Sequence, residues 1–346
     1  MTEFADFRSD TLTRPDASMR RAMAEAEVGD DVFGEDPTIA RLESRSAELL
    51  GKEAALYLPS GTMANQCAIH VHCRPGDELI CDERAHVFRY EGGAVARLSG
   101  VQIMTVRTEG GWPSSEQLDS SIRRDDPHFP RSRLLVLEQT HNMFGGRVTP
   151  QAEFDALCDQ AHDRGLRVHV DGARLMNAAV ATGRPAADLV ARADTLSLCL
   201  SKGLGAPVGS MLAGAAEFVA EARRARKAFG GGMRQAGILA AAGLLALEEG
   251  PSRLGTDHAR SAEICEAARG TAGLTAEKPD TNIVMIDVDN APALVEHLRQ
   301  HSVLALAVSP SRVRFVTHRD LERADVDRAL QAIQSFDPRL SDTESS

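Results

Sequence analysis

The chain has 346 residues, of which 43% are hydrophobic and 26% are charged, close to the average for a soluble globular protein. This composition argues against a disordered or fibrous chain. The 39 lysines and arginines face 50 aspartates and glutamates, so the formal net charge is −11. That charge argues against a general nucleic-acid binder, because phosphate binding needs a basic surface. At about 150 residues per domain, the length predicts two domains.

Membrane and extracellular classes find no support in the sequence. The most apolar run, residues 237–247, is shorter than the ~18–20 residues that cross a bilayer. The N-terminus lacks the basic-then-apolar pattern of a signal peptide. Six scattered cysteines without a CxxC pair favour neither a disulfide framework nor a zinc site. We therefore expect a cytoplasmic protein with reduced thiols, no bound metal and no membrane partner.

Short apolar runs bounded by turn residues predict strands through the first 250 residues, and helical patterns lie between several of them. The expected strands are 53–59, 77–81, 101–108, 133–140, 166–171, 195–201 and 209–213. The expected helices are 38–50, 62–72, 151–164, 186–193, 215–228 and 233–248. Buried strands without alternation, separated by helices, indicate a mostly parallel sheet covered on both faces.

The pattern changes after Gly250-Pro251. Helices are expected at 256–269, 291–301 and 321–336, and strands at 281–288, 303–308 and 313–317, which together form a compact α+β unit. We divide the chain into an N-terminal arm (1–14), a large α/β domain (15–250), a small C-terminal α+β domain (251–336) and a flexible polar tail (337–346). The arm carries no periodicity and is expected to pack on another part of the structure.

A lysine stands at the end of one expected strand. The apolar run 195–201 leads directly into Lys202, and three glycines follow within seven residues. A lysine at the end of a buried strand is costly unless it is exposed or does chemistry. When desolvated, its amine has a lowered pKa and can form a Schiff base with an aldehyde. Taken alone, the segment also fits a surface lysine in a turn.

A carboxylate ends another expected strand. Asp171 precedes Lys202 by 31 residues, the length of one strand–helix–strand unit. Both side chains can therefore emerge at the edge where the carboxyl ends of parallel strands form a ligand crevice. Pyridoxal phosphate needs this pair: a lysine for its aldehyde and a carboxylate that keeps its ring nitrogen protonated. Asp171 alone is also compatible with a helix N-cap.

A third segment, Ser60-Gly61-Thr62, lies between an expected strand and an expected helix. Free N–H groups at the start of a helix bind phosphate, aided by the helix dipole. Alone, these residues would be a simple cap. In chain order with Asp171 and Lys202, they predict a cup for the cofactor phosphate.

With these residues the sequence resembles the low-specificity L-threonine aldolases, of the threonine aldolase and β-eliminating lyase family. The matching segments span nearly the whole chain: FRSDTLTRP, VGDDVFGEDPT, LPSGTMANQ, EQTHN, HVDGARLMNA, CLSKGLGAPVGS, GGGMRQAGILAAAG and RFVTH. The resemblance implies a fold-type-I pyridoxal-phosphate enzyme, with a large mostly parallel sheet domain and a small C-terminal α+β domain. It also implies a homotetramer built from dimers, with active sites at the dimer interface.

The resemblance assigns the cofactor contacts. Lys202 holds the aldehyde of pyridoxal 5′-phosphate and Asp171 pairs with the ring nitrogen. Gly61 and Thr62 hold the phosphate. The remaining two contacts are Arg234, which reaches the phosphate from a neighbouring subunit, and His86, which stacks on the ring.

The resemblance also assigns the substrate contacts. Ser9, Arg174 and Arg314 hold the carboxylate, for which a planar guanidinium donates two parallel hydrogen bonds. His128 lies near the substrate hydroxyl. Each arginine and histidine, taken alone, also fits an ordinary surface residue. Arg312 is close to Arg314, and the register of RFVTH favours Arg314.

The implied reaction cleaves L-threonine, L-allo-threonine or related β-hydroxy-α-amino acids to glycine and an aldehyde, in threonine breakdown and glycine formation. A water held by His86 or His128 is the expected base, and the sequence leaves open which histidine holds it. An aminotransferase, a β-eliminating lyase and a non-catalytic scaffold remain as alternatives. Phe33 stands where many relatives carry tyrosine, so a hydroxyl is lost there.

Overall fold

One seven-stranded sheet forms the centre of the large unit. Its strands are β2 (Ala54–Leu58), β3 (Glu78–Asp82), β4 (Gln102–Val106), β5 (Ser132–Glu138), β6 (Arg167–Asp171), β7 (Thr195–Cys199) and β8 (Ser210–Gly214). They lie in the order β2-β8-β7-β6-β5-β3-β4 in the computed structural model, which describes residues 4–338. β8 runs antiparallel to β2 and β7, and every other pair is parallel. The expected mostly parallel sheet is confirmed.

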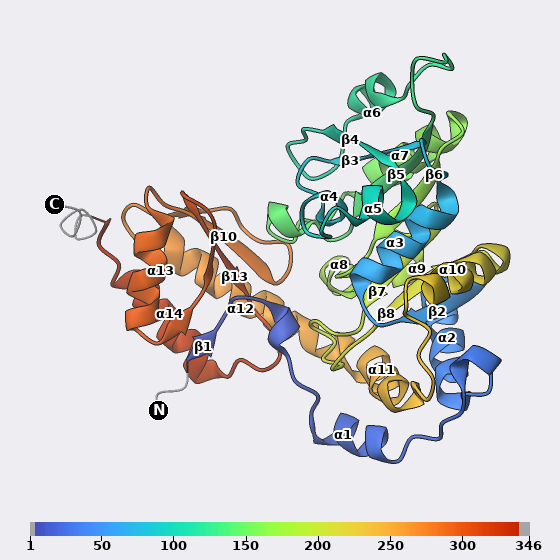
Figure 1. Ribbon diagram of the computed structural model, residues 1–346. Coiled ribbons are helices and arrows are strands. Elements are labelled where there is room, and N and C mark those ends of the chain that lie inside the picture. The colour runs from blue at the N-terminus through green and yellow to red at the C-terminus, as the bar shows by residue number, and fades with distance from the viewer. Residues whose placement is uncertain (1–3, 339–346) are drawn as a thin grey trace.

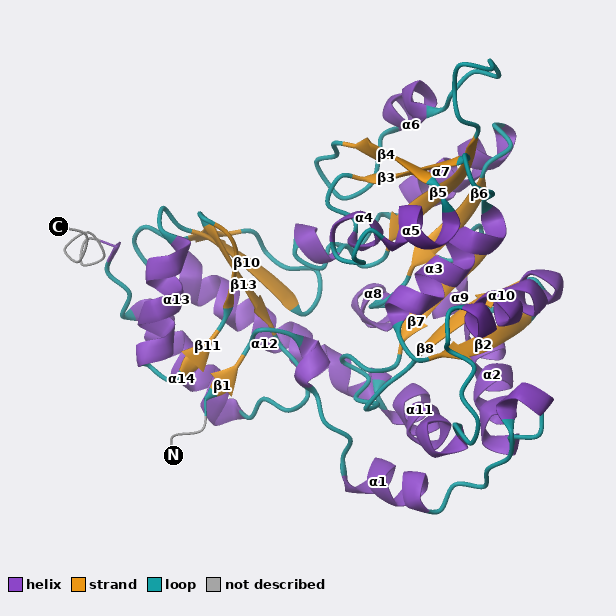
Figure 2. Cartoon of the chain, viewed as in Figure 1, coloured by secondary structure: helices purple, strands orange, loops and turns teal. Residues whose placement is uncertain are grey.

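Both faces of this sheet are buried. In β5, Leu135 and Leu137 belong to one hydrophobic core, while Leu134 and Val136 belong to another. Successive side chains of a strand point to opposite faces, so such a strand needs helices on both sides. α3 (Gly61–His72) and α10 (Ala216–Ala228) cover one face. The other is covered by α2 (Pro37–Leu50), α7 (Gln151–Asp163), α8 (Leu175–Thr182) and α11 (Gly237–Glu249), as Figure 2 shows.

Shorter elements complete this unit. They are α1 (Ala17–Ala24), α4 (His86–Arg89), α5 (Ala94–Ser99), α6 (Ser115–Ser121), α9 (Ala186–Leu189), and the 3-10 turns η1 (Asp10–Leu12), η2 (Asp31–Phe33) and η3 (Asn142–Phe144). α11 begins at Gly237, four residues later than the sequence predicted. The Asp36 carboxylate explains this start, because it accepts the Gly237 N–H at 2.9 Å.

The small unit has its own sheet and core. β9 (Thr275–Ala276), β10 (Ile283–Asp287), β12 (Leu306–Ser309) and β13 (Arg312–Val316) form an antiparallel sheet in the order β12-β13-β10-β9. The helices are α12 (Pro251–Arg269), α13 (Ala291–Gln300) and α14 (Arg323–Gln334). The strand expected at 303–308 is divided in two, since β11 (Val303–Leu304) pairs with β1 (Ala5–Asp6) of the arm instead of with β13.

The arm and α12 connect the two units. Phe7 is fully buried in the core of the small unit, and its ring lies 5.6 Å from that of Phe315. From there the arm runs to α1 beside the large unit (Figure 1). α12 contributes Leu254 to the large core and Ile264 to the small one. The division at residues 250 and 251 stays a prediction, and residues 339–346 of the expected flexible tail lie outside the described part. None of the helices in residues 4–338 has the length and apolar character to span a membrane.

Candidate active site

A cavity of about 440 Å³ opens at the carboxyl ends of β6 and β7. Both units contribute to its wall. It brings together eight of the residues that the sequence singled out: Ser9, Gly61, Thr62, His86, Asp171, Arg174, Lys202 and Arg314. A larger cleft of about 830 Å³ nearby, lined by Trp112 and Arg147 among others, contains none of these eight. The smaller cavity is therefore the candidate site.

Asp171 forms the buried end of β6. Its Oδ2 accepts a hydrogen bond from Asn65 Nδ2 at 2.8 Å, and its Oδ1 accepts the Ala173 N–H at 3.1 Å. Burial alone would raise the pKa of this carboxyl, but the positive charges of His86 and Lys202 lower it below its usual value. Asp171 is therefore held as an anion, which is the state that stabilises a protonated ring nitrogen.

A polar network beneath Asp171 fixes the Asn65 amide. Asn65 Oδ1 accepts from Ser197 Oγ at 2.9 Å and lies 3.1 Å from His169 Nε2. Burial lowers the pKa of His169 to about 3, so its ring is neutral. Its Nδ1 lies 2.9 Å from Thr195 Oγ1, which leaves Nε2 as the nitrogen that donates to Asn65. The amide NH2 of Asn65 therefore points toward Asp171.

His86 begins α4 and is held at two points. Its backbone N–H donates to Glu138 Oε2 at 2.8 Å, and its ring Nδ1 lies 2.9 Å from Glu91 Oε1. Burial lowers the pKa of His86, but the Glu91 hydrogen bond, with the charge of Asp171, brings it above its usual value. Nε2 has no protein partner among the described residues, so it is the nitrogen available for a cofactor or a water.

The two remaining cofactor groups are a lysine and a helix start. Lys202 is half-buried just after β7, and its carbonyl accepts from Thr13 Oγ1 at 2.9 Å. At the start of α3, Ser60 Oγ accepts the Met63 N–H at 3.1 Å. The N–H groups of Gly61 and Thr62 precede the hydrogen-bond ladder of the helix, which is the arrangement that binds phosphate. A side chain at Gly61 would meet Cys199 Sγ at 2.8 Å, so this turn requires glycine.

Arg174 is buried at the side of the cavity that faces the arm. Its Nε and Nη2 each donate to the Asp10 carboxylate at 2.7 Å. Burial would raise the pKa of Asp10, but the Arg174 charge lowers it to about 2. Nη1 of Arg174 has no hydrogen-bond partner within residues 4–338. Asp10 sets the orientation of this guanidinium, and it was not among the residues predicted from the sequence.

Arg314 comes from β13, across the cavity. Its Nη1 donates to Asn142 Oδ1 at 2.9 Å and its Nη2 to the Arg8 carbonyl at 3.1 Å, while its Nε is buried without a partner in the described structure. Burial, together with the charge of Arg174, lowers the pKa of Arg314 to about 10. A carboxylate placed between the two guanidiniums would relieve their repulsion. Arg312, by contrast, is paired with Asp287 at 2.6 and 2.9 Å.

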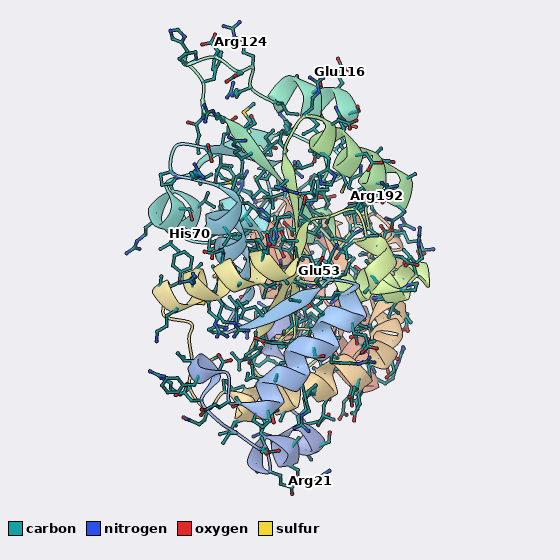
Figure 3. All side chains as sticks on the ribbon, turned by 90° about the vertical axis from the view of Figure 1, so that its right-hand side faces the viewer. Arg21, Glu53, His70, Glu116, Arg124 and Arg192 are labelled. Carbon is teal, nitrogen blue, oxygen red and sulfur yellow. The ribbon has the colours of Figure 1, made fainter. Side chains whose placement is uncertain are left out.

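Two predicted residues lie outside the cavity of this chain. The side chain of His128 is 88% exposed and its Nδ1 lies 2.8 Å from Asp126 Oδ1. Arg124, in the same loop between α6 and β5, lies at the outer tip of the molecule (Figure 3). The Arg234 side chain is 53% exposed and pairs with Asp30 at 3.0 Å. Neither His128 nor Arg234 lines the candidate site of its own chain.

Five polar residues of the site were missed: Asp10, Asn65, Glu91, Glu138 and Asn142. Asp10, Asn65 and Asn142 lie inside segments that carry the family resemblance, and so does Glu138. That placement was the available signal. Their partners, however, come from other elements of the chain, as the Asp10–Arg174 and Asn142–Arg314 pairs show. Chain order does not reveal such pairs.

Comparisons with known proteins identify the family and the fold. Residues 6–291 match the family model described as beta-eliminating lyase. The low specificity L-threonine aldolase of Escherichia coli O157:H7 is 45% identical, over 92% of this chain and 95% of that protein. A probable low-specificity L-threonine aldolase 2 of Arabidopsis thaliana is 41% identical, over 96% of each chain. A solved threonine aldolase of Leishmania major shares the fold, with a TM-score of 0.83 at 20% identity, covering 97% of this chain and 99% of that one.

Proposed function

The chain belongs to the beta-eliminating lyase family, and from that premise we propose that it is an aldolase that depends on pyridoxal phosphate. It cleaves L-threonine, L-allo-threonine and related β-hydroxy-α-amino acids to glycine and an aldehyde, in line with its 40–45% identical relatives. One observation carries the proposal. A single cavity is lined by Lys202 and the Asp171 anion together with the Arg174 and Arg314 guanidiniums.

The residues present fit the cofactor. Lys202 would hold its aldehyde, Asp171 its ring nitrogen, and the N–H groups of Gly61 and Thr62 its phosphate. The His86 ring would lie against its face. When bound, pyridoxal 5′-phosphate supplies a ring that accepts electrons from the bond being cleaved.

The substrate is held by its carboxylate. Arg174 is pre-oriented by Asp10, and Arg314 has one nitrogen without a partner in the described structure, so the two guanidiniums can share one carboxylate. Ser9 lines the same cavity and adds a hydroxyl donor. These contacts use only the carboxylate of the substrate, so its β-hydroxyl remains free to lose a proton.

A water on His86 Nε2 is our proposal for the base that takes the hydroxyl proton. His86 lines the cavity, whereas His128 would serve only from another copy of the chain. We therefore favour His86 as the group that holds the water and His128 as a residue near the hydroxyl in the assembled enzyme.

The proposed assembly is a homotetramer built from dimers, located in the cytoplasm. Arg234 supports the assembly, because it is exposed and outside the cavity of its own chain although the family resemblance places it at the phosphate. The six free, buried cysteines support a reducing compartment. Mixing the inactive Lys202→Ala and Arg234→Ala proteins tests the assembly. Hybrid dimers would contain one intact site and regain activity, and no recovery despite subunit exchange would argue against a shared site.

Initial rates with L-threonine, L-allo-threonine, phenylserine and serine test the activity. The proposal expects acetaldehyde and glycine from threonine without any keto-acid acceptor. Keto-acid-dependent turnover would indicate an aminotransferase instead, and ammonia release from serine without aldehyde formation from threonine would indicate a β-eliminating lyase.

A further inference from the structure

Glu91 is a buried carboxylate to which the proposed chemistry gives no contact with cofactor or substrate. It is 5% exposed and stands two residues beyond α4. Its Oε1 accepts from Asn65 Nδ2 at 2.9 Å, and its Oε2 accepts from Gln66 Nε2 at 2.6 Å. His86 Nδ1 donates the third hydrogen bond to this carboxylate, also to Oε1. A buried anion is costly unless donors surround it, and these three donors provide that surround.

Asn65 connects Glu91 to Asp171. Its Nδ2 carries two hydrogens, of which one goes to Glu91 Oε1 and the other to Asp171 Oδ2 at 2.8 Å. Its carbonyl oxygen is occupied by Ser197 and His169, so the amide cannot turn over without losing those bonds. A ring nitrogen of His86 and carboxylate oxygens of Glu91 and Asp171 all lie within 4.8 Å of one another. The His86 ring therefore lies beside two carboxylates that both favour a proton on it.

We propose that Glu91 is a positioning residue for the reaction. It keeps a proton on His86 Nδ1, so that Nε2 is the nitrogen that serves the cavity, and through Asn65 it holds the Asp171 carboxylate in place for the cofactor ring nitrogen. The inference rests on the proposed function for the identity of the cofactor. The protonation of His86 is a property of the chain itself and is measurable independently.

Other charged groups also act on His86. Asp171 at the end of β6 and Glu138 at the end of β5 both favour its protonated form, as Glu91 does. Lys202 lines the same cavity and opposes it by its positive charge, and the Tyr90 ring lies 5.7 Å away. Of these groups, only Glu91 makes a side-chain hydrogen bond to the His86 ring within the described structure. Its removal should therefore have a local effect on Nδ1.

Glu91→Gln is a matched test, because the amide keeps the shape of the carboxylate and removes the charge. The new amide oxygen can still accept from His86 Nδ1 and Asn65 Nδ2. The new NH2 group would face Gln66, whose Oε1 is buried without a partner in the described structure. If the Gln66 amide turns over, its oxygen accepts from this NH2 group, and all the hydrogen bonds are kept.

The measurement is a titration of the holoenzyme labelled in its histidine rings, with the His86 signal identified from His86→Asn. In the wild type, the nitrogen shifts should show a proton on Nδ1 across the titration. In Glu91→Gln, the midpoint of the His86 titration should move to lower pH. Threonine cleavage should lose roughly ten- to a hundredfold in kcat with little change in KM, a range typical of residues that orient catalytic histidines.

Glu78→Gln is the control. Glu78 is an equally buried carboxylate of β3 that is paired with Arg123 at 3.1 Å and makes no contact with His86. Its loss should lower the unfolding temperature and leave the His86 midpoint unchanged.

Two results would overturn the inference: an unprotonated Nδ1 in the wild-type enzyme, or an unchanged His86 midpoint in Glu91→Gln. The first needs no variant, so the inference stays testable if Glu91→Gln fails to fold. If the wild type does not cleave threonine, the proposed function fails while the histidine titration still decides the role of Glu91.

Discussion

The two walls of the cavity are held in different ways. The large unit holds Asp171 through Asn65, whose amide oxygen has its partners on strands of the same sheet. The small unit presents Arg314, whose two side-chain hydrogen bonds go to Asn142 and Arg8, outside its own sheet. The carboxylate that we propose meets the cofactor ring is therefore fixed within one unit, whereas the proposed recognition of the substrate carboxylate depends on how the two units meet.

The same contrast holds for charge. The Asp171 anion is compensated by hydrogen-bond donors and nearby positive charges. Arg314 is only partly compensated, because its Nε has no partner in the described structure and burial brings its pKa down to about 10. A group that is satisfied before binding is preorganised, and a group that is not has a place for a ligand. The part of the cavity around Asp171 is therefore preorganised before any ligand binds, whereas Arg314 gains a partner only when a ligand binds.

We call the part of the cavity formed by Lys202 and Asp171 of the large unit the cofactor wall, and the part formed by Arg314 of the small unit the substrate wall. The largest expected effect is on the cofactor wall. Lys202→Ala should lose the visible absorbance band of the bound cofactor and at least about a thousandfold in threonine cleavage, because Lys202 is the only lysine of the described residues that lines the cavity. Absorbance after borohydride reduction and dialysis, together with initial rates, checks this. A band that survives in the variant would mean that another lysine holds the cofactor.

On the substrate wall, Arg314→Ala should impair recognition far more than cofactor binding. Losing one desolvated, charged partner should cost about 2–4 kcal/mol in transition-state binding, or roughly 30- to 1000-fold in kcat/KM. The measurement is kcat/KM for L-threonine with cofactor saturation confirmed by absorbance.

Arg312→Ala is the matched control for Arg314→Ala, since it removes the same guanidinium two positions away in β13. Arg312 is paired with Asp287, so its loss should leave kcat/KM nearly unchanged. If Arg312→Ala were the crippled variant, the carboxylate contact would have to be reassigned.

A smaller effect tests the junction between the walls. Asn142→Ala removes the acceptor of Arg314 Nη1 and keeps the guanidinium itself. The loss of about 1 kcal/mol should raise KM for threonine roughly three- to tenfold and leave the cofactor band unchanged. Asn290→Ala is the comparison, because Asn290 caps α13 and so its loss should affect stability alone. Equal KM values in the two variants would show that Asn142 does not orient Arg314.

The sequence predicted the cofactor wall better than the substrate wall, for a physical reason. Lys202 and Asp171 stand at the ends of apolar strands, and strand ends in a parallel sheet meet at one edge. Their relation follows from local pattern alone. Arg314, by contrast, was assigned by resemblance, and its supports at Asn142 and Arg8 become visible only once the small unit is packed against the arm.

The fold shows the same limit. The apolar runs predicted the seven strands of the large sheet within a few residues. The strand expected at 303–308 is divided because β11 pairs with the N-terminal arm, almost 300 residues earlier in the chain. Likewise Glu91 takes its three hydrogen bonds from α3 and α4, which no periodicity connects.

The smallest effect on activity concerns a second buried acid near the junction. Asp257 lies on α12, which joins the two units, and its Oδ2 is buried without a partner among the described residues. Burial raises its pKa to about 7, with a contribution from the charge of Asp10. Asp10 is the opposite case, since the Arg174 guanidinium lowers its pKa to about 2. Of these two acids, Asp257 alone should therefore lower the free energy of unfolding as the pH rises from 4 to 7.

The sign follows from linkage. The pKa of Asp257 is higher in the folded than in the unfolded state, so its stabilising contribution is complete below the unfolded value of 3.8 and is lost as the pH rises through about 7. Asp257→Asn cannot ionise, so it should be more stable than the wild type at pH 8, by on the order of 2–4 kcal/mol, and little changed at pH 4. Thermal unfolding of both proteins at the two pH values measures this, while kcat/KM at pH 8 should stay within about twofold because the Asp10–Arg174 pair is untouched. An equal gain at both pH values would mean that Asp257 does not titrate in this range, and that its neighbours compensate it as fully as Arg174 compensates Asp10.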